Sequence, residues 1–331
     1  MKKIVVIGSN SFSGSDFIDN ALKETNYGIH GISRSPEKSS LFLPYKENAN
    51  IKRFSFHQMD LNQNMAELKK FLLDIKPEYI INFAAQSEVG PSWEHPEQWF
   101  RTNAVAIAEL GIFLKDQDWL QRYVHISSPE VYGTCEGTVR EDAPLNPSTP
   151  YAASKAAGDL MLFTLVKNFN FPLVMIRSTN VYGAHQQLFK IIPRSVIFLK
   201  KGKTIELHGG GQAIKSFIHI RDISRGELLA MLNGKNGQIY HLSPSDSGIA
   251  IKNVVRLICD EMGKSFDSCT KTVAERTGQD KAYIIDSSKA RRELGWNPKI
   301  PLNEGLKGVV AWVENNWNEI KDLPLDYIYK P

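Results

Sequence analysis

Five short apolar runs alternate with longer amphipathic stretches through the first half of the chain. The runs lie at 4–7, 29–33, 79–83, 122–126 and 172–176, and the stretches between them, at 14–24, 64–74, 97–115 and 153–168, have the length and pattern of helices. Strands that alternate with helices form a parallel sheet with helices on both faces and right-handed crossovers. The sequence therefore predicts an α/β fold built on a doubly wound parallel sheet.

The second half of the chain is less regular. Gly202 and the cluster 209–211 indicate loops, and the apolar run 217–220 predicts a strand that returns to the main sheet. We expect a larger lobe formed by residues 1–178 and 216–243. A smaller α/β lobe should consist of 179–215 and 244–331, with a substrate cleft between the two lobes.

Composition limits the classes of function. The 331 residues carry a net charge of +4, which is too small to indicate a nucleic-acid partner. No apolar run approaches the ~18 residues of a membrane span, and the chain opens as a strand rather than a signal peptide, so a cytoplasmic protein is expected. Three scattered cysteines indicate neither a disulfide framework nor a metal site.

The turn after the first apolar run has the character of a dinucleotide site. The run 4–7 leads into Gly8-Ser-Asn-Ser11-Phe-Ser-Gly14 and then into the first predicted helix. A buried strand, a tight turn and a helix whose N-terminal amides can hold a pyrophosphate make up the phosphate-binding unit of the Rossmann fold. The predicted cofactor contacts in this turn are Gly8, Ser11, Phe12, Ser13 and Gly14.

A second group of residues suggests acid–base chemistry. Tyr151 and Lys155 lie four apart, on one face of a predicted helix, and a nearby ammonium lowers the pKa of a phenol. Such a tyrosine can take the proton of a carbinol while hydride leaves its carbon. The strand at 122–126 ends in Ser127, Ser128 and Glu130, at the sheet edge where open α/β folds bind ligands.

Together these motifs resemble the extended short-chain dehydrogenase/reductase family, in its nucleotide-sugar 4,6-dehydratase branch. Two segments are similar to the GDP-mannose enzymes: Asn82-Phe-Ala-Ala-Gln-Ser-Glu-Val89 and Ser92-Trp-Glu-His-Pro96. Four others are more similar to the dTDP-glucose enzymes: His125-Ile-Ser-Ser-Pro-Glu-Val-Tyr-Gly133, Ser178-Thr-Asn-Val-Tyr-Gly183, Arg276-Thr-Gly-Gln-Asp280 and Glu293-Leu-Gly-Trp296. The resemblance runs almost from end to end.

The resemblance implies roles for the catalytic candidates. Tyr151 would take the C4 hydroxyl proton, and Lys155 would be its electrostatic partner and orient the nicotinamide ribose. Ser128 would hydrogen-bond the C4 oxygen, and Glu130 would remove the C5 proton. The expected reaction oxidises C4, eliminates water across C5 and C6, and returns hydride to C6.

A nicotinamide cofactor is implied as well. Asp60 and Leu61 would line the adenine, and Ala84 would also contact the cofactor. Ser11 stands where the family has a glycine, and its Cβ would crowd the pyrophosphate. The second strand ends in Ser33-Arg34 without the acid that selects NAD, so NADP is an alternative. We expect NAD, because an enzyme that returns its hydride within one turnover needs no particular redox pool.

A nucleotide-diphosphate sugar is the substrate that the resemblance implies. Asn180 would hold the diphosphate or the sugar. Basic side chains from separate loops suit a diphosphate, and the predicted contacts are Ser87, Ser127, Arg194, Lys215 and Arg276. His125 and His219 lie in apolar runs without metal-ligand spacing, so they are expected to be core histidines.

Pro129 departs from the pattern of the dTDP-glucose enzymes, which have an aspartic acid before the glutamate to protonate the leaving hydroxyl. Proline has no proton to give. Glu130 could serve both steps, the reaction could stop at an unsaturated sugar, or the enzyme could be a C4 or C5 epimerase or a decarboxylase. A non-catalytic dinucleotide-binding protein is the remaining alternative.

Two predicted helices carry more apolar residues than one packing face needs. They are 97–115 and 153–168, and one stripe of each should pack on the sheet. The second stripe predicts a homodimer, as in the family's four-helix interface.

Overall fold

The computed structural model describes residues 1–134, 137–245, 248–275 and 284–329. Arg276 and the motif that it begins lie outside the described residues. No helix in the described ranges is long and apolar enough to cross a membrane.

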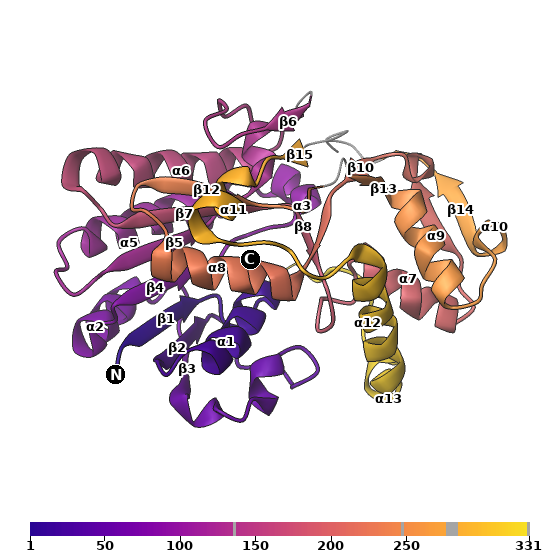
Figure 1. Cartoon of the computed structure of the whole chain (residues 1–331), viewed down its shortest axis with the longest axis horizontal. Coiled ribbons are helices and arrows are strands. Elements are labelled where there is room, and N and C mark those ends of the chain that lie inside the picture. The colour runs from indigo at the N-terminus through magenta and orange to yellow at the C-terminus, as the bar shows by residue number, and fades with distance from the viewer. Residues whose placement is uncertain (135–136, 246–247, 276–283, 330–331) are drawn as a thin grey trace.

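A seven-stranded parallel sheet forms the centre of the larger part of the molecule (Figure 1). Its order is β12-β7-β5-β4-β1-β2-β3, and neighbouring strands all pair in parallel. The strands are β1 (Lys3–Ile7), β2 (Gly28–Ser33), β3 (Phe54–Gln58), β4 (Tyr79–Asn82), β5 (Arg122–Ile126), β7 (Leu173–Ser178) and β12 (Gln238–Leu242). The predicted α/β fold with a doubly wound parallel sheet is confirmed.

Helices cover both faces of this sheet. On one face, α1 (Phe12–Glu24), α8 (Ile220–Asn233) and α11 (Ser288–Leu294) bury apolar side chains against alternate strand residues such as Ile4 and Val6. On the other, α2 (Met65–Ile75), α5 (Ala106–Leu114) and α6 (Pro150–Phe169) pack on the intervening residues Val5 and Ile7. This alternation is the pattern of a strand buried on both sides.

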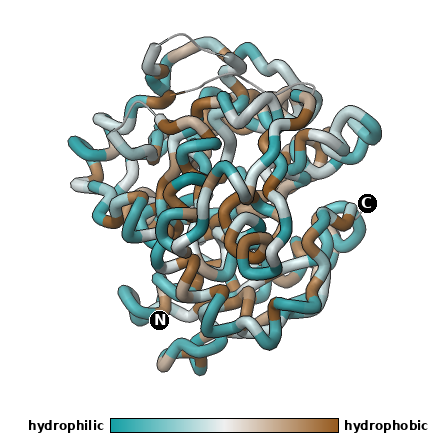
Figure 2. The backbone as a smooth tube through the Cα atoms, turned by 90° about the vertical axis from the view of Figure 1, so that its right-hand side faces the viewer, coloured by the Kyte–Doolittle hydropathy of each residue, from teal (hydrophilic) through white to brown (hydrophobic). Residues whose placement is uncertain are grey.

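A second hydrophobic cluster lies beyond the sheet, on the right in Figure 1. It is built around α7 (Ile191–Lys200), α9 (Ile251–Glu261) and α12 (Leu302–Asn315). The hydropathy-coloured trace shows hydrophobic segments running through the interior and hydrophilic ones along much of the outline (Figure 2). The remaining elements are α3 (Val89–Glu94), α4 (Pro96–Phe100), β6 (Thr138–Val139), β8 (Asn180–Tyr182), β9 (Ile205–His208), β10 (Ile214–Lys215), β11 (Phe217–His219), β13 (Ile249–Ala250), α10 (Phe266–Cys269), β14 (Thr270–Val273), β15 (Ile284–Ile285) and α13 (Trp317–Ile320).

One sequence-based expectation about strand pairing is wrong. The run 217–220 does not return to the main sheet: β11 pairs in parallel with β8 in a separate two-stranded sheet, and the return to the main sheet is made by β12. The expected helix at 97–115 is confirmed as one continuous helical segment, formed by α4, a π-helical stretch at Arg101–Val105, and α5. The apolar pattern of a three-residue strand does not identify the strand with which it pairs.

Candidate active site

A cavity of about 490 Å³ opens where β1, β2 and β4 end. Its lining includes seven of the predicted residues: Gly8, Ser11, Arg34, Asp60, Leu61, Ala84 and Ser87. They come from successive strand ends, the place where doubly wound sheets bind dinucleotides. The structure therefore brings most of the predicted cofactor residues together.

The chain packs closely on itself where β1 leads into α1, and two positions there need glycine. Gly8 has φ of +90°, and a Cβ there would lie 2.7 Å from the backbone nitrogen of Ala84. A Cβ at Gly14 would lie 2.4 Å from the carbonyl oxygen of Gly8, so both positions need glycine. Ser11 caps α1, since its hydroxyl accepts a hydrogen bond from the amide of Gly14 (3.0 Å). Phe12 and Ser13 follow in the first turn of α1 and are not part of the cavity wall described.

A second cavity of about 350 Å³ adjoins the first, because Glu88 and Phe189 line both. Three of the predicted substrate residues line it, namely Asn180, Arg194 and Lys215. Lys190 joins them, and its ammonium lies 2.6 Å from the Glu88 carboxylate. A cavity lined by several cations is suited to a diphosphate.

Tyr151 and Lys155 occupy the first two turns of α6. Thr149 caps this helix by accepting from the amide of Ala152 (3.1 Å), and Pro150 takes the first helical position. Both functional side chains are buried, with 9% of Tyr151 and 2% of Lys155 exposed. The predicted pair is therefore held by a well-capped helix end, although neither residue lines the two cavities as described.

Lys155 faces the end of β5. Its ammonium donates to the carbonyl oxygen of Ile126 (2.8 Å) and lies 3.5 Å from Nε2 of His125. Burial lowers the pKa of Lys155 to about 8, while the Asp159 carboxylate acts in the opposite direction. An amine with this pKa changes charge close to neutral pH.

The expectation that Lys155 lowers the pKa of Tyr151 is wrong for the net effect in this structure. Burial raises the pKa of the Tyr151 phenol, and the negative charge of Glu130 raises it further. A hydrogen bond with Ser128 acts the other way. Burial is the largest cause because the phenol loses its hydration, and an unsolvated phenolate is costly.

Ser128 and Glu130 lie beside Tyr151. They belong to the short 3₁₀ turn Pro129–Tyr132 after β5, where the Ser128 hydroxyl accepts from the amide of Glu130 (3.2 Å). Pro129 is buried at the first position of that turn. The structure thus brings Ser128, Glu130 and Tyr151 together, as the sequence predicted.

Ser127 has a different environment. Its hydroxyl donates to Asp159 (2.6 Å), which also accepts from the Arg177 guanidinium (2.7 Å). The hydroxyl is thus engaged in a buried ionic network, and its predicted contact with substrate remains a prediction. Asp159 and Arg177 were not singled out from the sequence, although Asp159 lies one turn beyond Lys155.

Asn103, also missed from the sequence, joins the cofactor side to α6. Its side-chain oxygen accepts from the backbone amide of Gln86 (2.9 Å). Its side-chain nitrogen donates to the backbone carbonyl of Gln86 (2.9 Å) and to the hydroxyl of Ser154 (2.9 Å). It lies in the π-helical stretch, a feature often found at functional sites. His125 is fully buried, as expected for a core histidine, whereas His219 is half-buried and caps α8.

Comparison with known proteins agrees with this geometry. The model of the GDP-mannose 4,6 dehydratase family matches residues 5–309. A dTDP-glucose 4,6-dehydratase of Streptomyces niveus is 30% identical over 332 residues, covering 96% of each chain. The crystal structure of DesIV, a dTDP-glucose 4,6-dehydratase from Streptomyces venezuelae with NAD and TYD bound, superposes with a TM-score of 0.88 at 28% identity, covering 96% of this chain and 98% of that one.

An epimerase also shares the fold. A UDP-glucuronic acid 4-epimerase mutant from Bacillus cereus superposes with a TM-score of 0.85 at 26% identity, over 95% of this chain and 99% of the other. Dehydratases and epimerases therefore both resemble this structure.

Proposed function

Because the chain belongs to the GDP-mannose 4,6-dehydratase family, we propose that it is a nucleotide-sugar 4,6-dehydratase, a lyase that uses NAD and carries out its chemistry at Ser128, Glu130, Tyr151 and Lys155. The observation that carries the proposal is the position of Glu130 beside Tyr151 and Ser128. A plain 4-epimerase needs no carboxylate at this place, whereas removal of a C5 proton does.

The cofactor is NAD, which is bound in the neighbouring dehydratase structures. The cavity fits it, since its lining comes from the ends of successive strands and includes Ser11, the N-cap of α1. Ser11, Arg34, Asp60, Leu61 and Ala84 would hold the dinucleotide. Bound NAD supplies the acceptor for the C4 hydride and later the donor of hydride to C6.

The chain's own residues move the protons. Tyr151 takes the proton of the C4 hydroxyl, while Ser128 hydrogen-bonds the same oxygen and the Lys155 ammonium favours the charged phenol. The C4 ketone acidifies the C5 proton, which Glu130 removes. Glu130 then gives this proton to the C6 hydroxyl, which departs as water and leaves a 4-keto-5,6-unsaturated sugar. Return of hydride to C6 and of a proton from solvent to C5 would then give the 4-keto-6-deoxy sugar, while Tyr151 releases to solvent the proton that it took from the C4 hydroxyl.

A single carboxyl serves both proton transfers because Pro129 can supply none. Burial and the fixed φ of proline position the turn that presents Glu130. Because Pro129 supplies no acid, it also supports the alternative functions. These are an enzyme that stops at a 5,6-unsaturated sugar, a C4 or C5 epimerase, or a decarboxylase. Among these, the reactions at C5 would also use Glu130.

The sugar nucleotide occupies the second cavity. Arg194, Lys190 and Lys215 would hold the diphosphate, and Asn180 the sugar or the diphosphate. Ser87 and Ser127 remain proposed contacts, as does Arg276. The cleft would lie between the proposed lobes, 1–178 with 216–243 and 179–215 with 244–331.

Glu130→Gln tests the proposal. The variant should stop after C4 oxidation and accumulate 4-keto sugar together with the absorbance of dihydronicotinamide, without losing water. Incubation with UDP-, GDP-, CDP- and dTDP-sugars and mass spectrometry of the products identifies the substrate. Glu109→Gln, at an exposed carboxylate on α5, is the control and should behave as the parent enzyme. Normal product from Glu130→Gln at near parental rate would mean that no C5 chemistry occurs.

The protein is further proposed to be a cytoplasmic homodimer. Support comes from exposed apolar side chains on the helical face: Val105 (61%), Ile112 (45%), Leu160 (59%) and Phe169 (52%). Apolar groups exposed along adjacent helices suit a partner subunit. Light scattering that gives the 37.3 kDa mass of one chain at micromolar concentration would contradict the dimer.

A further inference from the structure

The C-terminal segment 322–329 passes across the cofactor cavity. Five of its residues line that cavity: Leu323, Pro324, Asp326, Tyr327 and Ile328. The opposite wall comes from the ends of β1, β2 and β4, more than 200 positions earlier in the chain. The cavity therefore has a wall on the sheet side and a second wall made by the end of the chain.

Side chains of the segment alternate between partly buried and exposed positions. Leu323, Leu325, Tyr327 and Tyr329 are the partly buried ones, while the residues between them are exposed. Leu323 and Leu325 pack against the second hydrophobic cluster. This alternation is typical of an extended segment with one inward face.

Tyr329 anchors the far end of the segment on the sheet side. Its ring stacks on His95 (centroids 5.0 Å apart, 13° between planes) and on Trp99 (6.0 Å, 6°). Its hydroxyl donates to the side-chain oxygen of Gln98. Tyr327 meets Phe189 edge to face (5.3 Å, 72°), and Phe189 lines both cavities. The segment is thus held on both sides of the cofactor cavity.

We propose that residues 322–329 form a strap that retains the dinucleotide, with Tyr327 as a contact in the cavity wall and Tyr329 as the anchor. The inference rests on the NAD binding of the proposed function and adds a second binding element to it. The strap shares its cavity with Arg34, Asp60 and Leu61, so it covers the end that would hold the adenosine. Both tyrosines also lie within electrostatic reach of Arg34.

Retention has a chemical reason. A dehydratase returns hydride to its own product, so the cofactor is regenerated in each turnover and need not exchange. Release past the strap requires the three aromatic contacts and the Gln98 hydrogen bond to open first. Each such contact contributes a modest free energy, and together they slow release by at least about tenfold.

The rate of NAD release tests the strap. Purified holoenzyme is loaded with isotopically labelled NAD, an excess of unlabelled NAD is added, and the loss of bound label is followed. We expect Tyr327→Ala/Tyr329→Ala to release NAD about tenfold faster or more. Tyr329→Phe keeps the stacking and loses only the hydrogen bond to Gln98, so it should release NAD about two- to tenfold faster.

Glu314→Gln is the matched control, because Glu314 is exposed on α12, outside the strap, and is not part of the cavity lining described. It should release NAD at the parental rate. A release rate within twofold of the parent for both tyrosine variants would overturn the inference while leaving the proposed reaction intact. A chain that binds no NAD would overturn the inference together with the cofactor assignment. Neither outcome depends on turnover of a sugar nucleotide.

Discussion

Two buried ionic networks flank the main sheet, and one of them touches α6, the helix that carries Tyr151 and Lys155. Beneath α6, Asp159 binds Arg177 and Ser127 and lies 3.7 Å from Nε2 of His125, which in turn lies beside Lys155. Arg177 also donates to the hydroxyl of Tyr132, which lies 2.8 Å from His241. This network supports the floor of the proposed active site.

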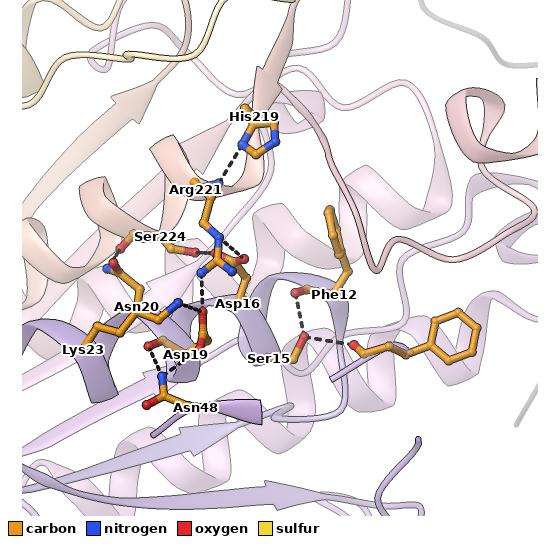
Figure 3. A network of polar contacts seen from close by, with 11 residues as sticks. Phe12, Ser15, Asp16, Asp19, Asn20, Lys23, Asn48, His219, Arg221 and Ser224 are labelled. Atoms are coloured by element: carbon orange, nitrogen blue, oxygen red, sulfur yellow. Dashed lines mark hydrogen bonds and ion pairs between the residues drawn. The ribbon is translucent and has the colours of Figure 1, made fainter. Parts of the chain in front are cut away.

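The other network lies between α1 and α8, on the opposite face of the sheet (Figure 3). The Arg221 guanidinium pairs with Asp16 (3.2 Å) and Asp19, and Ser224 donates to Asp16 (2.6 Å). Asn48 donates to Asp19 (2.7 Å) from the loop that follows β2. These contacts join two helices that are some 200 residues apart in the chain.

Both networks contain strongly shifted groups, so a shifted pKa does not locate the active site by itself. Burial raises the pKa of Asp16 to about 6 and raises that of Glu227, also on α8, well above its usual value. The cavity lining does not separate the two sets either, because neither these carboxyls nor Glu130, Tyr151 and Lys155 are among the residues that line the cavities described. Structural ion pairs shift pKa values equally well. The proposed catalytic groups are distinguished by their place, since Glu130 follows the carboxyl end of β5 and Tyr151 hydrogen-bonds Ser128 at that end.

The largest difference between the surroundings of the two networks should appear in turnover. Tyr151→Phe removes the proton acceptor and should lower turnover by about 10²–10⁴-fold. Sugar-nucleotide binding and the midpoint of unfolding should change little, since the ring remains in place. Steady-state kinetics and calorimetry measure the two effects. Retention of more than a tenth of the activity would show that Tyr151 is not the base.

Substitution of Asp159 should affect both stability and catalysis, which would distinguish the network beneath α6 from the one between α1 and α8. Asp159→Asn leaves the buried Arg177 charge without its partner, and we expect a loss of about 3–5 kcal/mol of unfolding free energy. The Asp159 carboxylate also raises the pKa of Lys155. Its loss should therefore move the alkaline limb of the turnover profile to lower pH.

Urea unfolding and a pH–rate profile measure these two effects of Asp159→Asn. A variant with the expected loss of stability but an unchanged alkaline limb would show that the network is only structural.

The contrast between the networks also shows what could be predicted from the sequence. Apolar runs predicted five of the seven strands, and Gly8, Gly14, Tyr151 and Lys155 fell where predicted because turn chemistry and helical spacing are local. β3 was missed because it is an edge strand whose side chains are only partly buried, so it carries no apolar run. The pKa of Tyr151 was misjudged because burial is set by the whole fold.

Other features depend on contacts between distant segments. Asp159 and Arg177 meet only when α6 packs beside β7, and the wall formed by 322–329 depends on the path of the chain through the second hydrophobic cluster. Neither has a local sequence signal. Asn103 could have been suspected only from its place in a helix with an irregular turn.

The smallest expected difference is a pH dependence of stability in the network of Figure 3. The folded pKa of Asp16, about 6, lies above its ordinary value of 3.8. Its contribution to stability is therefore complete below about pH 4 and is lost as the pH rises through about 6. The groups that face it are Arg221, Asp19, Lys23 and Glu227.

Asp16→Asn removes this titration. The difference in unfolding free energy, parent minus variant, should therefore fall as the pH rises from about 4 to 7. The fall should be at most about 3 kcal/mol, because the pKa of Asp16 is shifted by about two units. Asp19→Asn is the matched control with the opposite sign. The pKa of Asp19 is lowered by its hydrogen bonds from Lys23, Asn48 and Arg221, which outweigh burial, so its contribution is present at neutral pH and lost on acidification. Urea titrations across this range measure both slopes, and turnover at neutral pH should remain parental in both folded variants. A fall in turnover without a fall in stability would show that the two networks are coupled through the sheet.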